Sequence, residues 1–494
     1  SGGSGNDRLS GDDGNDTMVS SGGNDTLTGG QGSDVFVIGR AAGTTTLADY
    51  DRDNLVERVD LTGFADLTSR ADLTFTNQGD NVRVTADGLS LVFLNTQASD
   101  LDDGDFLFAG ENPLVFNVDP SIAMADLQQL LDGAPPGATI NLAAGVYSIT
   151  ETLRISRSDI SLVGAGEGQT IFRSDVSPDT PGPTLKVEPT DMQIRLGVIP
   201  EDIALGSRTV TLPDSHEFAV GDLLYVTQPN DAEWLAETGN AGWEPPVNPE
   251  DQVRDGEDYY LREFRSRIVS IENNVATLAE PSPYAFEAGV ALLAESTFLS
   301  NVNLSHFTIE GIWGNSDPFN FEVTLDAWEG RSTLEMDGVR DSHLQNISII
   351  EPASHAFRFQ RIYDVTGDSL TGVGAHNKAG GNGYHFMLYE AFSNDFTNLS
   401  STDARHAVLF TSYSAEHYNN IHLLFSNRDI NFHGSPDADN TVVVDVMRQD
   451  YPAGSTPQFD AVQGGSFPLH PYWTIEANDV TFRDAITGER NDII

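Results

Sequence analysis

The sequence predicts an all-β protein whose short parallel strands stack coil upon coil, with a small antiparallel β insertion. Three observations support this fold class. Residues 1–37 repeat with a period of nine. Between residues 299 and 484, phrases of alternating apolar residues recur at the spacing of one coil. Between these regions, alternating strands are joined by Gly-Asp and Asn-Asn turns, which is typical of antiparallel hairpins.

Charge and composition exclude several classes of function. The 494 residues include 26 Lys and Arg against 75 Asp and Glu, a net charge of −49. Nucleic acids and anionic membranes are poor partners, since both require a basic surface. So acidic a chain repels itself unless cations bind, and divalent cations are the expected cofactor. Because the chain has no cysteine, disulfides and thiolate metal sites are excluded. No apolar run is long enough for a spanning helix.

The first element is a block of four nonapeptides, GGSGNDRLS, GDDGNDTMV, SSGGNDTLT and GGQGSDVFV. Each has an aspartate and, two residues later, a large apolar residue. The glycine-rich turn exposes carbonyl and carboxylate oxygens, which are hard ligands suited to Ca²⁺. One inward apolar residue per repeat does not offset the entropy of ordering, so folding should need the ion. A disordered linker is the alternative, but it gives no reason for the apolar period.

This pattern resembles the RTX family of calcium-binding parallel β-rolls. The resemblance implies that each ion lies between repeat n and repeat n+2, held by turn carbonyls and repeat aspartates. The third repeat has Ser20-Ser21 in place of paired glycines, and its site is expected to be weaker. The expected ligands are Asp7, Asp16, Asp25 and Asp34, with Gly3, Gly5, Gly14, Gly23 and Gly32.

Residues 38–112 resemble the segment that closes RTX rolls in secreted proteases and epimerases. The stretch LADYDRDNLVERVDLTGF resembles the aspartate-rich turn and strand of that segment, and LDDGDFLFAG resembles its last strand. Asp49 and Asp51 are therefore candidate calcium ligands, with a solvated acidic turn as the alternative. Residues 485–494 resemble the first repeat, and a second RTX block is expected to begin there.

Residues 113–186 are expected to start the stack of coils. Asp119-Pro120-Ser121 predicts a helix cap, apolar residues recur at helical spacing from Met124, and Gly133 ends the helix. Short strands follow at close intervals. The stretch looks like the entry to a right-handed parallel β-helix of the pectate-lyase-like kind, with the helix covering the exposed end of the stack.

Residues 187–298 are expected to form the antiparallel insertion, and residues 299–484 the remaining coils. In the insertion, Trp234 and Trp243 either line a sugar groove or anchor a loop. In the coils, asparagines recur at the same place in successive phrases, and we expect them to form a buried amide ladder: Asn346, Asn398, Asn420 and Asn440. A second phrase starts at His355, Gly383, His406 and Asp429, the last three 23 residues apart.

Polar and basic residues gather between residues 355 and 433, a local positive spot that suits an anionic polysaccharide. By resemblance, the GGNGY, RHA and HG phrases are shared with a group of bacterial secreted β-helix proteins, and they identify a fold rather than a reaction. The Asp-Pro-His phrase of secreted mannuronan C5-epimerases does not occur in the sequence.

Elimination or C5-epimerisation of a uronate needs its carboxylate neutralised and a base at C5. Arg405 could neutralise the charge. The candidate bases are Tyr384, His385 and Lys378, and His433 with Asp429 could act as acid. The alternative is that such residues hold turns by hydrogen bonds inside the coil.

Three functions remain open. The first is a secreted calcium-binding lyase or epimerase acting on acidic polysaccharide, exported by type I secretion. The second is a non-catalytic extracellular surface or matrix protein that calcium assembles, with possible end-to-end self-association. The third is glycoside hydrolysis, which needs two carboxylates, and no spacing singles out a pair among Asp395, Asp403 and Asp429. Whether the chain is an enzyme at all is left open.

Overall fold

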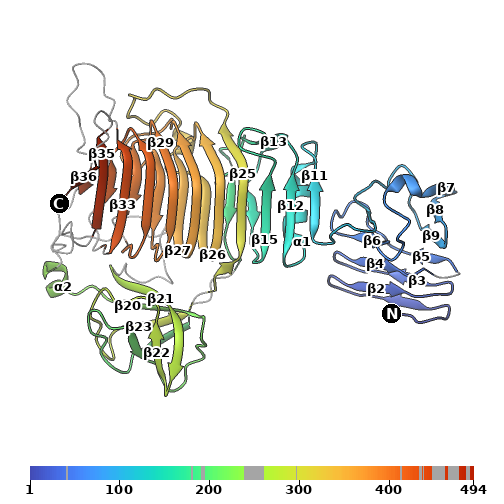
Figure 1. The fold of residues 1–494 in the computed structure, drawn as a ribbon, viewed down its shortest axis with the longest axis horizontal. Helices are drawn as coiled ribbons and strands as arrows, with labels where there is room; N and C mark the ends of the chain where they lie inside the picture. Colours follow the sequence, from blue (N-terminus) through green and yellow to red (C-terminus); the bar gives the residue numbers. More distant parts are fainter. Residues whose placement is uncertain are drawn as a thin grey trace. The chain divides into compact units, whose positions relative to one another are not determined.

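The computed structural model describes residues 1–40, 43–179, 182–190, 195–237, 261–295, 297–411, 414–432, 437 and 439–447, and the strands at 462–464, 478–484 and 490–493. The chain divides into two compact units, Ser1–Leu142 and Ala143–Ile494. Strands dominate both units (Figure 1). The predicted fold class is confirmed, with parallel coils and an antiparallel insertion. None of the described helices has the length and apolar character needed to cross a membrane.

The N-terminal unit begins as a roll in which successive repeats alternate between two sheets. The register pairs Leu9 with Leu27 in one sheet and Met18 with Phe36 in the other. Met18, Leu27 and Phe36 are buried in a common core, as the apolar period predicts. The strands are β1 (Arg8–Ser10), β2 (Thr17–Ser20), β3 (Thr26–Thr28), β4 (Val35–Ile38), β5 (Thr45–Leu47) and β6 (Arg58–Asp60).

A three-stranded antiparallel meander and a short strand extend the two sheets of the roll. The meander, β7 to β9, joins β5 through β9, and β10 pairs parallel with β6. Phe93 lies in the core of the roll, and its ring packs edge to face against the rings of Tyr50 and Phe106. The elements are η1 (Arg70–Asp72), β7 (Thr74–Gln78), β8 (Asn81–Ala86), β9 (Leu89–Phe93) and β10 (Phe106–Leu107).

The same unit ends with β11 (Val115–Val118), α1 (Met124–Gly133) and β12 (Ala138–Leu142). The roll packs against this segment, since the Arg58 guanidinium lies 3.9 Å from the centre of the Phe116 ring. The expected helix is present and ends at Gly133. Its cap differs, because the N-cap is Ala123, which has no side-chain cap. Asp119 instead accepts a hydrogen bond from the Ser121 amide within a turn.

The second unit is a stack of parallel strands. The long strands β26 and β27 pair from Ser332↔His355 to Ile350↔Val373. Further along, Tyr384 pairs with His406 and Val408 with Ile430, so the recurring phrases do stack. The strands before the insertion are β13 (Gly145–Ile149), β14 (Leu153–Ile155), β15 (Ile160–Gly164), β16 (Thr170–Ser174) and β17 (Leu185–Val187).

The elements after the insertion are β24 (Leu299–Ser300), β25 (Val302–Gly311), η3 (Asp326–Trp328), β26 (Ser332–Ile350), β27 (His355–Val373), β28 (Tyr384–Tyr389), β29 (Asp395–Thr402), β30 (His406–Phe410), β31 (Asn420–Ser426), β32 (Ile430–Phe432), β33 (Asn440–Met447), β34 (Val462–Gly464), β35 (Asn478–Asp484) and β36 (Arg490–Ile493). The last strand pairs antiparallel with β35. Residues 485–489, where the second repeat block is expected to begin, lie outside the described residues.

An asparagine ladder runs through the coils, but its members differ from those expected. Asn394 Nδ2 donates to Asn419 Oδ1, and Asn419 Nδ2 donates to Asn440 Oδ1, both at 2.8 Å. All three are buried. Of the four expected members, Asn440 belongs to the ladder. Asn420 is exposed, while Asn346 and Asn398 have positive φ and bond His306 and Asp368 instead.

The insertion is a curled antiparallel sheet with its own core. Trp234 is 7% exposed and packs edge to face on Tyr284, which favours a role as an anchor. Trp243 lies outside the described residues. The elements are β18 (Arg195–Val198), β19 (Thr209–Thr211), β20 (Leu223–Gln228), α2 (Ala232–Glu237), β21 (Arg262–Glu272), β22 (Val275–Leu278) and β23 (Leu292–Glu295).

Candidate functional site

The turns of the roll are bonded to one another two repeats apart. The Asp7 amide donates to Asp25 Oδ1 at 3.0 Å, and the Asp16 amide donates to Asp34 Oδ1 at 2.9 Å. Each turn takes the number of its repeat. The turns of repeats 1 and 3 therefore stack on one edge of the roll, the odd-numbered edge, and the turns of repeats 2 and 4 stack on the other, the even-numbered edge. The stacking is close, since Gly32 has a φ of 134° and any Cβ there would overlap the Gly14 carbonyl. The expected turn glycines thus bring backbone carbonyls together along each edge.

Three of the four repeat aspartates leave one carboxylate oxygen buried without a partner. The Oδ2 atoms of Asp7, Asp16 and Asp34 have no hydrogen-bond partner among the described residues. Asp34 is fully buried. A buried carboxylate oxygen without a donor is costly, and a cation would remove that cost.

Acidic groups concentrate on the edge that holds the even-numbered turns. The register of β4 with β6 places Glu57 beside Asp34, and Glu57 is 3% exposed. Burial raises the pKa of Glu57 to about 8, and the charges of Asp34, Asp51 and Asp49 act in the same direction. Asp49 accepts hydrogen bonds from the Gly29 and Gly30 amides, while Asp51 accepts one from the Asp53 amide.

In the coils, most of the residues proposed for uronate chemistry are buried and hydrogen-bonded internally. His385 faces Ser401 Oγ and the Gly374 carbonyl, both at 2.8 Å, and burial lowers its pKa to about 4. Lys378 Nζ donates to the carbonyls of Ala375 at 2.6 Å and Asp317 at 2.9 Å. Burial lowers the pKa of Lys378 to about 8. The lysine therefore ties residues 314–331 onto the coils.

A second group centres on His406, which is buried between Asp429 and Arg405. The Asp429 carboxylate lies 2.9 and 3.0 Å from His406 Nδ1, and Arg405 Nε donates to His406 Nε2 at 3.2 Å. This arrangement fits a neutral ring that carries its proton on Nδ1. The Tyr384 ring stacks on His406 at 5.4 Å. The structure thus brings together Arg405, Tyr384 and Asp429.

The candidate catalytic residues differ in their exposure to solvent. Lys378, Tyr384, His385 and Asp429 are buried, whereas Arg405 is partly exposed. His433 lies outside the described residues. Arg405 also donates to the Lys378 carbonyl at 2.9 Å, which fixes the position of its guanidinium.

A buried cluster of carboxyl groups, which was not predicted from the sequence, lies where the insertion meets the coils. Its centre is Arg265, whose guanidinium lies 4.9 Å from the ring centres of Tyr225 and Phe298. The acidic members are Glu263, Glu390, Glu416 and Asp437. Burial raises the pKa of Glu390 to about 8 and that of Glu416 to about 7. The available signal was acidic residues inside otherwise apolar stretches, such as MLYEAF.

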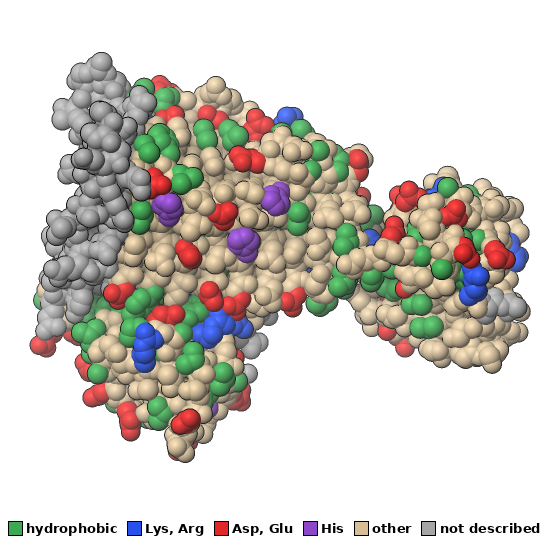
Figure 2. Space-filling model, in the orientation of Figure 1, with side chains coloured by type: hydrophobic (Ala, Val, Ile, Leu, Met, Phe, Trp, Pro, Cys, Tyr) green, Lys and Arg blue, Asp and Glu red, His purple; other side chains and the backbone are tan. Residues whose placement is uncertain are grey.

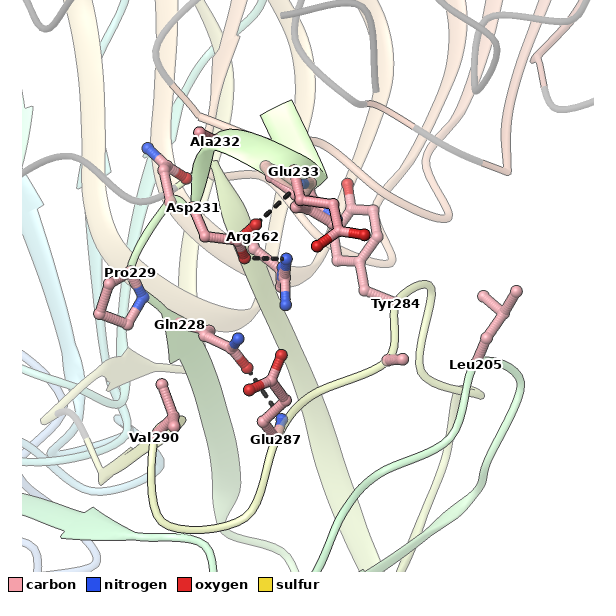
Figure 3. A pocket seen from close by; sticks show the side chains of 13 residues that line it. Leu205, Gln228, Pro229, Asp231, Ala232, Glu233, Arg262, Tyr284, Glu287 and Val290 are labelled. Atoms are coloured by element: carbon pink, nitrogen blue, oxygen red, sulfur yellow. Dashed lines mark hydrogen bonds and ion pairs between the residues drawn. The ribbon is translucent and has the colours of Figure 1, made fainter. Parts of the chain in front are cut away.

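The insertion also has a pocket of about 720 Å³ beside α2 (Figure 3). Arg262 lies in its wall and pairs with Asp231 at 2.8 Å, while the Glu287 amide donates to Gln228 Oε1. Asp231, Glu233 and Glu287 make this lining acidic, which disfavours an anionic sugar.

Comparison with known proteins identifies the first of these regions. Residues 1–36 match the family model of the RTX calcium-binding nonapeptide repeat, in four copies. The N-terminal segment is an RTX repeat block. The resemblance drawn from the sequence is confirmed there. A search of curated proteins finds no match to the chain.

Several solved structures are similar to the chain at low identity. The tailspike protein gp49 of Pseudomonas phage LKA1 has 15% identity and a TM-score of 0.47, with 65% of this chain and 49% of that protein covered. The chain thus spans about half the length of the tailspike. The Azotobacter vinelandii mannuronan C-5 epimerase AlgE4 A-module has 10% identity and a TM-score of 0.28, covering 66% and 72%. The Yersinia enterocolitica family 28 exopolygalacturonase has 12% identity and a TM-score of 0.26, covering 83% and 71%.

The turns of the RTX block present oxygen atoms of the type that calcium prefers. In the described ranges, no three histidine or acidic side chains converge as a ready-made metal site. Most ligands of an ion would therefore be turn carbonyls, joined by the buried Oδ2 atoms of the aspartates. This donor set is entirely oxygen and flexible in geometry, which fits Ca²⁺ better than a metal that prefers nitrogen or sulfur.

Proposed function

We propose that the chain is an extracellular calcium-binding β-helix protein that acts on acidic polysaccharide as a lyase or C5-epimerase. The observation that carries the calcium part is the set of buried, unpartnered Oδ2 atoms in the RTX block. Asp7, Asp16 and Asp34 would hold ions together with the carbonyls of the turn glycines Gly3, Gly5, Gly14, Gly23 and Gly32. Calcium supplies the positive charge that the stacked carboxylates need, so binding and folding are coupled.

Asp49 and Asp51 are assigned a supporting role on the even-numbered edge. They are exposed and lie near the buried carboxyl groups of Asp34 and Glu57. A cation at this edge would relieve the mutual repulsion of these groups. Export by type I secretion is part of this proposal and rests on the RTX match.

The polysaccharide part of the proposal rests on Arg405. Its guanidinium is partly exposed and is held by His406 and by the Lys378 carbonyl. A fixed guanidinium can pair with a uronate carboxylate and so acidify C5. Asp429 acts as a positioning residue, because it orients the ring of His406. Tyr384, whose ring stacks on His406, is the candidate base among the described residues.

One observation favours a non-catalytic matrix or surface protein instead. Four of the five described candidates are buried, and Lys378, His385 and Asp429 are bonded to groups inside the fold. The visible face of the coils also has scattered acidic side chains and few Lys or Arg residues (Figure 2). Such a face is not a basic groove. In this alternative, calcium makes the roll rigid, and chains associate end to end.

The two functions are separated by one assay with a matched pair of variants. The full chain is incubated with calcium and a panel of acidic polysaccharides, while unsaturated ends and proton exchange at C5 are measured. Turnover that is lost in Arg405→Ala and retained in Arg173→Ala supports the proposal, since Arg173 is an exposed arginine on β16. Silence of the wild type on every substrate supports the matrix function.

A further inference from the structure

The third RTX repeat differs from the others in what surrounds its aspartate. In the other three repeats, the first residue is a glycine, and the space beside it borders the repeat's own carboxylate. A Cβ on Gly2 would lie 2.7 Å from Asp7 Oδ2, and one on Gly11 would lie 2.7 Å from Asp16 Oδ2. These carboxylate oxygens are the unpartnered ones. The glycine therefore places no side-chain donor beside the second oxygen of each aspartate.

In the third repeat, Ser20 occupies this first position. Its Oγ donates to Asp25 Oδ2 at 2.7 Å, and it lies 2.8 Å from Thr45 Oγ1. Asp25 Oδ1 is already bonded to the Asp7 amide. Both oxygens of Asp25 thus have donors, and Ser20, Asp25 and Thr45 are all buried.

The position of Thr45 makes the two edges of the roll different. The register of β3 with β5 pairs Thr26 with Thr46, so Thr45 lies where the next aspartate of the odd-numbered edge would be. On the even-numbered edge, the corresponding place is held by the carboxyl group of Glu57. One edge therefore continues with a carboxyl group, and the other continues with a hydroxyl group.

We propose that the Ser20 and Thr45 hydroxyl groups replace a calcium ion at the third repeat, so that Asp25 is not a calcium ligand. A hydroxyl donor satisfies a carboxylate oxygen without a cation, and it must be displaced before an ion can bind there. Calcium ligation by the repeat aspartates is then limited to Asp7, Asp16 and Asp34. This inference rests on the proposed calcium binding by the RTX block.

The test is the number of calcium ions bound by the full chain, counted by titration calorimetry and native mass spectrometry. Asp25→Asn preserves the acceptor for the Asp7 amide and is expected to bind as many ions as the wild type. The matched variant Asp34→Asn is expected to lose an ion. The double variant Ser20→Gly/Thr45→Asp restores a glycine and a carboxylate on the odd-numbered edge, and it is expected to gain an ion.

The outcomes distinguish this inference from the proposed function. Loss of an ion in Asp25→Asn overturns the inference and leaves calcium binding by the block intact. A double variant that folds but binds no more calcium than the wild type also overturns it. If the wild type binds no calcium, the proposed function fails, and the inference fails with it.

Discussion

Replacing Asn419 by alanine removes the middle member of the asparagine ladder. Asn419 is fully buried. Its Oδ1 accepts hydrogen bonds from the Asn394 side chain at 2.8 Å and from the Asn394 amide at 3.2 Å. Alanine leaves these two donors without that acceptor. At about 1–3 kcal/mol for each orphaned buried group, the expected loss in the free energy of unfolding is about 2–6 kcal/mol.

The matched control is Asn420→Ala, one residue away and exposed. It is expected to change stability by less than about 0.5 kcal/mol. Urea unfolding measures the free energy of unfolding of both variants, and amide hydrogen exchange in β29, β31 and β33 shows where the structure is weakened. If Asn419→Ala and Asn420→Ala unfold alike, the ladder does not stabilise the coils, and the argument from orphaned donors is wrong.

Three further outcomes are expected. Excess chelator should speed amide exchange in residues 1–40 and leave residues 299–411 unchanged; calcium at 100 times its Kd adds about 2.7 kcal/mol, so equal exchange with and without chelator contradicts calcium-coupled folding. Burial raises the pKa of Glu390 to about 8, so the folded state retains a proton that the unfolded state loses near pH 4.5. Stability should fall by about 1.4 kcal/mol per pH unit between these values, and Glu390→Gln should lessen the slope by that amount in urea unfolding; an unaltered slope refutes the assignment. Lys378→Met should speed proteolysis within residues 314–331, because the Asp317 carbonyl in that segment loses its donor; unchanged cleavage would show that this lysine does not hold the segment.

The repetitive parts of the fold could be predicted from the sequence because each repeat places the same residue types at the same positions. One apolar residue every ninth position placed Leu27 and Phe36 in the core of the roll. The ladder shows the limit of this reasoning. Side chains alternate between the faces of a strand, so a shift of one residue moves a side chain from the core to solvent. Asn419 is buried and Asn420 exposed, and the recurring phrase alone did not distinguish them.

The candidate site was harder to predict from the sequence, since composition does not distinguish a polar groove from a buried polar network. Lys378 and His385 were singled out because basic residues gather in that stretch, and the fold places both inside with internal partners. The carboxyl cluster was missed for another reason. Glu263 and Glu416 are far apart in the chain, and only the docking of the insertion brings them together.

Each nonapeptide supplies half of a coil, because turns bond to those 18 residues away. The genetic length of the block is thereby constrained. Loss of the second or third nonapeptide would transfer every later turn to the opposite edge, so that Asp34 would follow Asp7 and lose Asp16 as its neighbour. Only the first two turns after the deletion acquire new neighbours, but every later turn changes edge without any change in its residues. The number of repeats can therefore change during evolution by pairs of nonapeptides, whereas a change by an odd number requires substitutions in the displaced turns.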